Sequence, residues 1–298
     1  LIGSHGQTIC HLPGPPRGST LQIGESAVIS ARLASPVVSN FRVADVAVGG
    51  QGAPLVPWTD FVLLQHPRRT RVVQNIGGIA NFTWLASGGR IGDVVAMDSG
   101  PGNMILDGLV RRLTRGRERL DRGGRLARKG RGSWTVLGHL MQHPYLYRNS
   151  PKSCGREEFG DAYVDALLHR FARSKLSLDD WLATATFFSA MSIWLAYAMI
   201  AQSRGETTLH EIILCGGGAK NSTLVRDLQR CVWGSEFGAK VVFSTTDDHG
   251  IPAQAKECVS FAMLAAACID GVPANLPQVT GAKTPVVLGQ ICDVRTRA

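Results

Sequence analysis

The chain has 298 residues, of which 44% are hydrophobic and 18% charged, a composition that is typical of a globular protein and excludes an intrinsically disordered one. Its formal net charge is +9, from 32 Lys and Arg against 23 Asp and Glu, which raises the question of nucleic acid binding. Its seven cysteines are odd in number, widely spaced and without a CxxC pair, which argues against a disulfide framework or zinc site and favours a reducing compartment.

Residues 1–66 consist of short apolar runs separated by glycine and proline turns. This pattern predicts strands at 8–12, 20–23 and 36–39 and a helix at 25–33. The chain opens at Leu1, directly before a dense polar motif at 3–8, and we expect that an N-terminal segment precedes it.

Polar residues in glycine-rich surroundings recur through this first part of the chain. They are Ser4, His5, Gln7, Thr8, Arg42, Asp45 and Gln51. Their hydroxyl, amide and guanidinium groups are those that a sugar-binding wall requires, although each residue alone also fits an ordinary turn. His5 and His11 lack metal-ligand spacing to other His or Cys, so a zinc site is rejected.

Residues 72–98 combine short apolar runs with glycine turns. The pattern predicts three strands in series: 72–75, 79–85 and 94–98. The last strand leads into the loop Asp98-Ser99-Gly100-Pro101-Gly102-Asn103 and then into a helix predicted over 104–113.

A carboxylate at the end of a buried strand lies at the carboxyl edge of a sheet, where ligands bind in α/β proteins. Asp98 has this place. Backbone amides near Gly100 and Gly102, with the start of the following helix, are expected to hold phosphate oxygens. The alternative is an ordinary strand-to-helix turn with an aspartate cap.

Two further glycine-rich loops follow predicted strands. In the first, Gly77 and Gly78 form a hairpin turn beside Asn75, and their amides could face a phosphate. In the second, Gly216-Gly217-Gly218 precedes Asn221, and the missing side chains would let adenine or ribose approach the backbone. A plain hairpin and a tight turn are the alternatives. Neither GxGxxG nor GxxxxGK[ST] is present, so a dinucleotide site and a P-loop are not indicated.

The excess positive charge is concentrated in one segment. Ten Lys and Arg lie within 111–131 against only Glu118 and Asp121, so the rest of the chain is nearly neutral. No aromatic residue interleaves these basic residues and no DNA-binding motif is present. The pattern therefore favours a solvated helix and loop over a nucleic acid interface.

The later part of the chain alternates helix and strand, which predicts a largely parallel sheet. The expected helices are 158–172, 178–203, 221–231 and 253–270, and the expected strands are 211–215 and 241–244. The longest apolar stretch, 187–201, is shorter than the roughly 20 residues that span a bilayer, so no membrane partner is expected.

A series of motifs runs in order along nearly the whole chain: Gly3-Ser4-His5-Gly6-Gln7-Thr8-Ile9, Thr20-Leu21-Gln22-Ile23-Gly24, Gly49-Gly50-Gln51-Gly52-Ala53-Pro54-Leu55-Val56-Pro57, Asn75-Ile76-Gly77-Gly78-Ile79-Ala80-Asn81, Asp98-Ser99-Gly100-Pro101-Gly102-Asn103, Pro151-Lys152-Ser153, Gly155-Arg156-Glu157, Cys215-Gly216-Gly217-Gly218-Ala219, Ala255-Lys256-Glu257, Leu276-Pro277 and Gly281-Ala282. In this series the chain resembles the anhydro-N-acetylmuramic acid kinase family.

The resemblance implies an α/β, two-domain actin-like ATPase (ribonuclease H-like) fold. Residues 1–66 would be the C-terminal part of the first, sugar-side domain, whose N-terminal portion is expected to be missing. Residues 67–298 would be the second, nucleotide-side domain, and a return of the last stretch of about 25 residues to the first domain is an alternative.

The resemblance also implies an activity. ATP would phosphorylate the 6-oxygen of 1,6-anhydro-N-acetylmuramic acid while water opens the anhydro bridge, which gives N-acetylmuramic acid 6-phosphate in cell-wall sugar recycling. Asp98 would be the general base, and Glu257 would hold Mg²⁺. Lys256 beside it is expected to be solvated. The nucleotide and phosphate set is Asn75, Gly77, Gly78, Gly100, Gly102, Asn103, Gly216, Gly217, Gly218 and Asn221, and the sugar set is His5, Gln7, Thr8, Arg42 and Gln51.

Three alternatives remain open. The chain could be a levoglucosan kinase, which phosphorylates a plain 1,6-anhydro sugar without lactyl and acetamido groups, or an inactive fragment that only binds sugar. It could also bind nucleic acid through residues 111–131, the least favoured of the three. By resemblance, the expected partners are ATP and an anhydro sugar, with a homodimer in the cytoplasm.

Overall fold

The computed structural model describes residues 1–14, 18–150, 152–206 and 208–294. The described residues form two compact units. Unit 1 takes them from Leu1–Arg68, Thr83–Ala96 and His249–Ala298, and unit 2 from Arg69–Phe82 and Met97–Asp248. The first segment of unit 1 ends close to the expected boundary at residue 66. A return of only the last stretch of the chain to the first domain was the alternative expected from the sequence. In the structure the part of the chain that returns to unit 1 begins at His249, and Thr83–Ala96 also belongs to unit 1.

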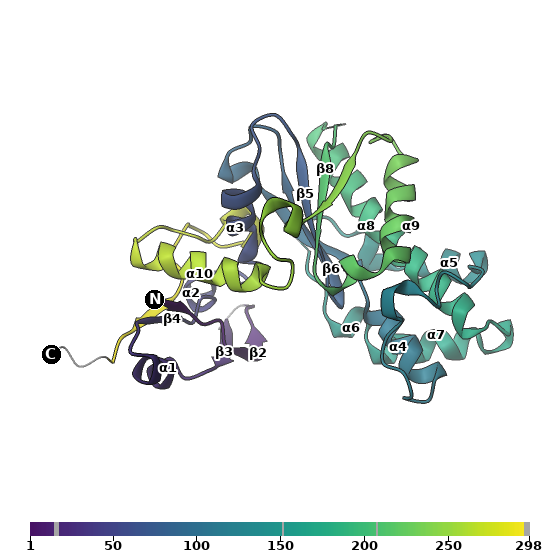
Figure 1. The fold of residues 1–298 in the computed structure, drawn as a ribbon, viewed down its shortest axis with the longest axis horizontal. Helices are drawn as coiled ribbons and strands as arrows, with labels where there is room; N and C mark the ends of the chain where they lie inside the picture. The colour runs from purple at the N-terminus through teal and green to yellow at the C-terminus, as the bar shows by residue number, and fades with distance from the viewer. Residues whose placement is uncertain (15–17, 151, 207, 295–298) are drawn as a thin grey trace. The chain divides into compact units, whose positions relative to one another are not determined.

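Unit 1 contains a three-stranded sheet, a two-stranded hairpin and helices that pack on them (Figure 1). The elements are β1 (Ile2–Gly3), β2 (Gln7–Leu12), β3 (Ser19–Ile23), α1 (Ser26–Leu33), β4 (Val37–Ser39), α2 (Val43–Ala47), α3 (Val56–Leu64), η1 (Ile91–Asp93), α10 (Lys256–Ile269), α11 (Pro277–Thr280) and β10 (Gln290–Cys292). In the sheet, β4 lies between β1, to which it is parallel, and β10, to which it is antiparallel. The three strands and the helix expected in this part are confirmed to within a residue at each end.

The core of unit 1 joins residues from both ends of the chain. Val38 and Phe41 pack with Leu264 of α10 and with Leu288, and all four side chains are buried. The sequence of residues 1–66 alone therefore could not show which apolar residues form this core.

A buried ion pair also holds unit 1 together. Lys256 donates to Asp60 Oδ1 at 2.7 Å, and Thr83 Oγ1 donates to the other carboxylate oxygen at 2.7 Å. The expectation that Lys256 is solvated is wrong, because the ammonium group is enclosed with its counter-charge. A buried pair of this kind is costly to break, since the remaining charge would be left without a partner.

Unit 2 is built on a five-stranded sheet of order β7-β6-β5-β8-β9 (Figure 1). Its strands are β5 (Arg71–Ile76), β6 (Ile79–Leu85), β7 (Val95–Pro101), β8 (Glu211–Cys215) and β9 (Val242–Thr245), and β6 and β7 extend into residues that count with unit 1. The pairs β5–β8 and β8–β9 are parallel. Strands β5 and β6 are neighbours joined by only two residues, so they are antiparallel. The first strand lies in the middle, in agreement with the expected ribonuclease H-like domain, and the α/β class is confirmed.

The helices of unit 2 lie between β7 and β8 and between β8 and β9 in the sequence, with one short helix after β9. They are α4 (Met104–Leu113), η2 (Arg122–Gly124), α5 (Trp134–Leu140), η3 (Pro144–Tyr147), α6 (Arg156–Phe159), α7 (Asp161–Arg170), η4 (Ala172–Ser174), α8 (Leu178–Arg204), η5 (Gly217–Lys220) and α9 (Ser222–Trp233), with η6 (Thr246–His249) at the boundary between the units. The single helix predicted over 158–172 is instead broken at Gly160. A Cβ there would overlap the carbonyl oxygen of Arg156, so only glycine allows α6 and α7 to meet this closely.

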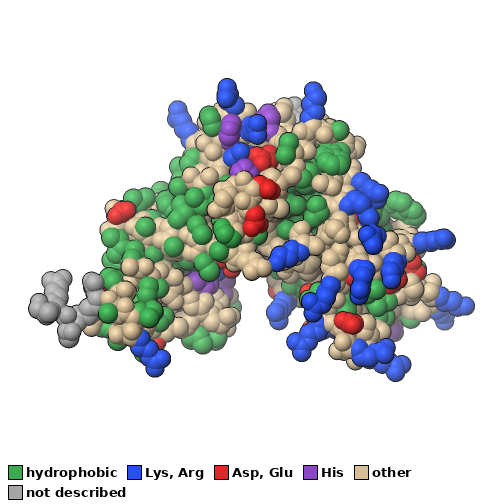
Figure 2. Space-filling model, in the orientation of Figure 1, with side chains coloured by type: hydrophobic (Ala, Val, Ile, Leu, Met, Phe, Trp, Pro, Cys, Tyr) green, Lys and Arg blue, Asp and Glu red, His purple; other side chains and the backbone are tan. Residues whose placement is uncertain are grey.

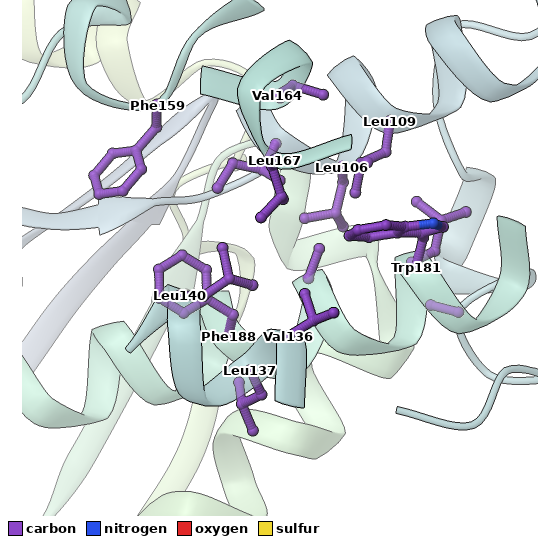
Figure 3. Packing of buried hydrophobic residues seen from close by; sticks show 14 of the residues in the cluster. Leu106, Leu109, Val136, Leu137, Leu140, Phe159, Val164, Leu167, Trp181 and Phe188 are labelled. Atoms are coloured by element: carbon purple, nitrogen blue, oxygen red, sulfur yellow. The ribbon is translucent and has the colours of Figure 1, made fainter. Parts of the chain in front are cut away.

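The helices of unit 2 share one apolar core (Figure 3). Leu106 and Leu109 of α4 belong to one cluster with Leu140 of α5, Leu167 of α7 and Phe188 of α8, and all five are buried. Among the described residues, α8 is the one helix long and apolar enough to cross a membrane by length and composition. Most of its apolar window is buried inside the protein, as in the core helix of a globular domain.

The basic segment lies on the helical part of unit 2. Figure 2 shows Lys and Arg side chains gathered over the region of α4, α5 and α7. Arg111 and Arg112, in the last turn of α4, pair with Asp161, and Arg112 also pairs with Asp165. The other basic side chains of the segment are exposed, as the solvated helix-and-loop interpretation predicts.

Candidate functional site

The three glycine-rich loops of unit 2 meet at one edge of its sheet. The amides of Gly102, Asn103 and Met104 donate to the carbonyl oxygens of Gly77 and Gly78, each at 2.9 Å. The side-chain amide of Asn103 adds a bond to the Gly77 oxygen at 3.1 Å. These amides were expected to be free for phosphate, and that expectation is corrected: they bind one loop to the other.

Close approach explains why this contact needs glycine. A Cβ at Gly102 would overlap the Gly77 carbonyl oxygen, and a Cβ at Gly100, where φ is +139°, would lie 3.1 Å from Ser192 Oγ. Ser189 Oγ holds the same loop by donating to the Gly102 oxygen at 2.9 Å. Ser189 and Ser192 of helix α8 therefore hold this loop in place.

The loop at 216–218 packs against the end of β5. A Cβ at Gly216 would overlap Asn75 Oδ1, and one at Gly218 would overlap the side chain of Ile76. A Cβ at Gly217 would meet nothing within 4 Å. Gly216 and Gly218 are thus explained by packing, whereas Gly217 leaves open backbone that a flat ligand can approach.

Two asparagines proposed for the nucleotide site have structural contacts as well. Asn221 caps α9, since its Oδ1 accepts from the amide of Leu224 at 3.1 Å. Asn75 Oδ1 lies 4.0 Å from Cys215 Sγ, at the meeting point of β5 and β8. Between them these residues position the start of α9 and the glycine loop.

Gly217→Val is expected to weaken ATP binding and to leave the free energy of unfolding nearly unchanged. The added side chain would enter open space and obstruct a nucleotide without straining the protein. Calorimetric titration with ATP and urea unfolding measure the two quantities.

Gly218→Val is the matched control, since its side chain would collide with Ile76 and destabilise unit 2. Unchanged ATP affinity in Gly217→Val would remove this loop from the nucleotide site.

Asp98 lies in β7 beside the glycine loops, where its side chain is largely enclosed. Its Oδ2 accepts from the amide of Cys154 at 2.7 Å. Its own carbonyl oxygen accepts from the hydroxyl of Tyr145 at 2.9 Å, and its amide donates to the Lys152 oxygen at 3.3 Å. These bonds hold the carboxylate in one orientation.

Burial raises the pKa of Asp98 from its ordinary 3.8 to about 6, and the Cys154 amide and the charge of Lys152 offset part of this rise. A general base is most effective when its pKa lies near the working pH. The Asp98 carboxyl lies in the middle of β7 and not at the end of the strand as expected, because the strand continues to Pro101. It has the protonation behaviour that a base needs near neutral pH.

Lys152 and Tyr145 were not among the expected site residues. The ammonium group of Lys152 donates to the carbonyl oxygens of Leu146 at 2.9 Å and Tyr145 at 3.3 Å, and it lies 4.9 Å from the centre of the Tyr145 ring. Burial lowers the pKa of Lys152 to about 8. The Pro151-Lys152-Ser153 motif was a signal for this residue, although position 151 lies outside the described residues.

In unit 1, His5 and Arg42 come together as expected. Arg42 Nε donates to His5 Nε2 at 3.1 Å, and Arg42 Nη1 donates to the Gly52 carbonyl oxygen at 2.6 Å. Burial lowers the pKa of His11, as does the charge of Arg42, and a bond with the Gln51 backbone offsets part of this. These residues form one polar cluster, with Gln51 present through its backbone.

The β2–β3 hairpin brings Thr8, which was expected in the sugar set, together with three polar side chains that were not. Thr8, His11, Thr20 and Gln22 are half-buried on one face, where His11 Nδ1 lies 3.0 Å from Thr20 Oγ1 and Gln22 Nε2 donates to Thr20 Oγ1 at 2.7 Å. Gln7 is exposed, and among the described residues its side chain bonds only to the Thr8 carbonyl oxygen, at 3.4 Å, so it is not part of this cluster.

The remaining polar residues of unit 1 have other contacts. Ser4 donates its amide to the Val38 oxygen at 2.8 Å, within the sheet. Asp45 is completely buried and accepts from Asn275 and Thr280, so it is a structural residue. Glu257 is exposed in the first turn of α10, where its charge acts on His5 and Arg42 without an ion pair to either among the described residues.

Over residues 1–293 the chain matches the family described as anhydro-N-acetylmuramic acid kinase. Curated relatives of that name share 42% identity in Caldanaerobacter subterraneus subsp. tengcongensis and 43% in Salinibacter ruber. Each alignment covers 98% of this chain, and 73% and 72% of the respective relative. The chain belongs to the anhydro-N-acetylmuramic acid kinase family. This confirms the resemblance drawn from the motifs and makes the chain a member of a carbohydrate kinase family.

Two solved structures that match the chain are only distantly similar to it. The activator of the 2-hydroxyisocaproyl-CoA dehydratase from Clostridium difficile with bound ADPNP matches with a TM-score of 0.38 and 14% identity, over 78% of this chain and 70% of that one. A ROK family glucokinase from Streptomyces griseus in complex with glucose and AMPPNP matches with a TM-score of 0.33 and 12% identity, over 88% and 78%. Likeness this weak assigns neither a fold nor a ligand.

Proposed function

We propose that this protein uses ATP to phosphorylate the 6-oxygen of 1,6-anhydro-N-acetylmuramic acid while water opens the anhydro bridge. The product is N-acetylmuramic acid 6-phosphate. Family membership supports the substrate, and the enclosed carboxylate of Asp98, with a pKa raised to about 6, supports the chemistry. A cytoplasmic location and a homodimer are proposed on the resemblance alone.

Asp98 is proposed to take a proton from the attacking water. The water oxygen then bonds to the anomeric carbon, the bond from that carbon to the 6-oxygen breaks, and the 6-oxygen bonds to the γ-phosphorus as ADP leaves. A positioned base contributes about 10²–10⁴-fold to the rate. Alignment of the bound reactants would contribute much of the remainder.

The described residues fit the two expected groups differently. The open backbone at Gly217, between two packed glycines, fits a nucleotide. For Mg²⁺, no group of three or more His, Cys, Asp or Glu among the described residues could hold an ion, and Glu257 is exposed. A magnesium site is therefore not formed by these side chains, although Mg²⁺ in phosphoryl-transfer enzymes takes many of its ligands from phosphates and water.

An isotope experiment on the purified protein tests the proposal. The reaction is run in ¹⁸O-labelled water with ATP and 1,6-anhydro-N-acetylmuramic acid, with levoglucosan in parallel. One label at the anomeric carbon and an unlabelled phosphate ester at the 6-oxygen are expected. A product that keeps the anhydro ring would contradict ring opening, preference for levoglucosan would favour that kinase, and sugar binding without turnover would favour the inactive alternative.

The pH dependence of kcat/KM follows from the pKa of Asp98. A base acts in its deprotonated form, so kcat/KM is expected to rise with pH and to level off above about 6. Initial rates at low sugar concentration between pH 5 and 8 measure this limb. A rate independent of pH over this window would show that no group with this pKa acts as the base.

A further inference from the structure

One segment of the chain, residues 145–154, covers the edge of the sheet at Asp98. Strand β7 is the first in the order β7-β6-β5-β8-β9, so its outer edge has no strand partner among the described residues. The backbone of Asp98 bonds to the segment instead. Its amide donates to the Lys152 oxygen at 3.3 Å, and its carbonyl oxygen accepts from the Tyr145 hydroxyl at 2.9 Å. Two points of one segment therefore hold Asp98.

The side chain of Lys152 joins these two points. Its Nζ donates to the carbonyl oxygens of Leu146 at 2.9 Å and Tyr145 at 3.3 Å, and it lies 4.9 Å from the centre of the Tyr145 ring. Lys152 thus contacts Asp98 through its backbone and the turn that carries Tyr145 through its ammonium group. Without the ammonium group, the buried oxygens of this turn would lose their donor, and the turn could move away from β7.

The two carboxylate oxygens of Asp98 have different surroundings. Oδ2 accepts from the amide of Cys154, in the same segment, at 2.7 Å. Oδ1 has no hydrogen-bond partner among the described residues. The held oxygen fixes the plane of the carboxylate, and the other oxygen is left to accept a proton.

Lys152 also supplies a positive charge beside Asp98. The other titratable side chains of the segment that face this carboxylate are Tyr145 and Cys154. Burial raises the pKa of Tyr145 above its ordinary value and that of Cys154 to about 12, so both are neutral near pH 7. Among the described residues, the Lys152 ammonium has no carboxylate within ion-pair distance. Its charge therefore acts on Asp98 without a closer partner, and it favours the ionised form of that carboxyl.

We propose that Lys152 is a positioning residue for the proton transfer: its ammonium group fastens the segment 145–154 around Asp98, leaves Oδ1 to take the proton of the attacking water, and places a positive charge beside the carboxylate. This inference rests on the proposed function, to which it adds a residue that acts through Asp98. Misplacement of a reacting group by about 1 Å costs about 10²-fold in rate, so loss of the fastening contact is expected to be visible in kcat.

Lys152→Met tests the inference, because methionine keeps an unbranched apolar chain and removes the charge and its donors. We expect kcat to fall by about 10- to 100-fold, and the rising limb of kcat/KM to move up by about one pH unit. A role in stability alone would not move this limb. Carbon NMR of protein labelled at the aspartate carboxyls reads the pKa of Asp98 without turnover, and Asp98→Asn assigns the signal.

Two further variants complete the test. Arg148→Met is the matched control, since this cation also lies over the Tyr145 ring, at 5.3 Å, but it is half-exposed and paired with Glu158 at 2.6 Å. It should leave the limb where it is. Tyr145→Phe removes only the hydroxyl that binds the Asp98 oxygen. It is expected to lower kcat by about 10-fold with the limb unmoved, and it serves where Lys152→Met does not fold.

The outcomes separate this inference from the proposed function. A folded Lys152→Met protein whose limb and carboxyl pKa stay near 6 would overturn the inference alone. Unchanged kcat in Tyr145→Phe would do the same where Lys152→Met does not fold. An unaltered protein that converts no anhydro sugar would overturn the proposed function and the positioning role with it.

Discussion

Asp98→Asn is expected to reduce turnover by about 10²–10⁴-fold and to leave ATP affinity unchanged. Asparagine keeps the size of the side chain and can still accept from the Cys154 amide, but it cannot take a proton from water. The measurements are kcat with 1,6-anhydro-N-acetylmuramic acid and the ATP dissociation constant.

The same variant is expected to be more stable than the unaltered protein at pH 8. The pKa of Asp98 is raised by burial, so the stability from the buried neutral carboxyl is present below about pH 4 and lost as pH rises through about 6. Asparagine stays neutral throughout. The rise from 3.8 to about 6 corresponds to at most about 3 kcal/mol of unfolding free energy at pH 8, and to about half of that at pH 5. Thermal unfolding at the two pH values measures the difference.

Loss of turnover together with a gain of stability separates a catalytic role from a structural one. Asp93→Asn is the matched control, because this exposed carboxyl lies just before β7 and takes no part in the glycine loops. Near-normal turnover in Asp98→Asn would remove Asp98 from the role of base.

Asp45→Ala is expected to lower the free energy of unfolding by about 3–5 kcal/mol. The carboxylate is completely buried and accepts from Gly52 N, Asn275 Nδ2 and Thr280 Oγ1, each at 2.7 Å. Alanine would leave three buried donors without an acceptor, and each such donor is costly. Urea unfolding measures the loss, and hydrogen exchange should place it in the backbone bonds Gln51–Thr280 and Lys283–Val48.

Asp161→Ala is the control for this prediction. Its carboxylate also accepts from arginine side chains, at 2.9 and 3.0 Å, but it is 70% exposed. Water compensates an exposed pair, so a loss below about 1 kcal/mol is expected. An equal loss for both variants would show that burial does not decide the strength of the Asp45 contacts.

The positions of the glycine loops could be predicted from local sequence, but the contacts between them could not. Glycine runs after apolar strands identified the loops at 75–78, 98–103 and 216–218, because strand ends and glycine turns are short-range features of sequence. Their mutual contact is a long-range feature. The bonds from Gly102 to Gly78 and from Asn103 to Gly77 use amides that the sequence pattern left free for a phosphate.

The β2–β3 hairpin marks the limit of pattern reasoning in unit 1. Simple alternation would place Thr8 on the same face as Cys10 and Leu12. A bulge between Thr8 and Cys10 shifts the register, so that Thr8 and His11 share the half-buried face and Leu12 is exposed. One extra residue reverses the alternation for the rest of a strand, and the sequence does not mark its position.

By itself the sequence determined the family, the α/β class and most element bounds, because these depend on local composition and on motifs in linear order. Only the tertiary structure decided which polar groups are available to ligands. Gly217 and Asp98 keep open groups, whereas Asp45 and Lys256 are enclosed by partners from the opposite end of unit 1. A side chain's burial and partners depend on residues far away in sequence, so neighbouring residues carry little information about them.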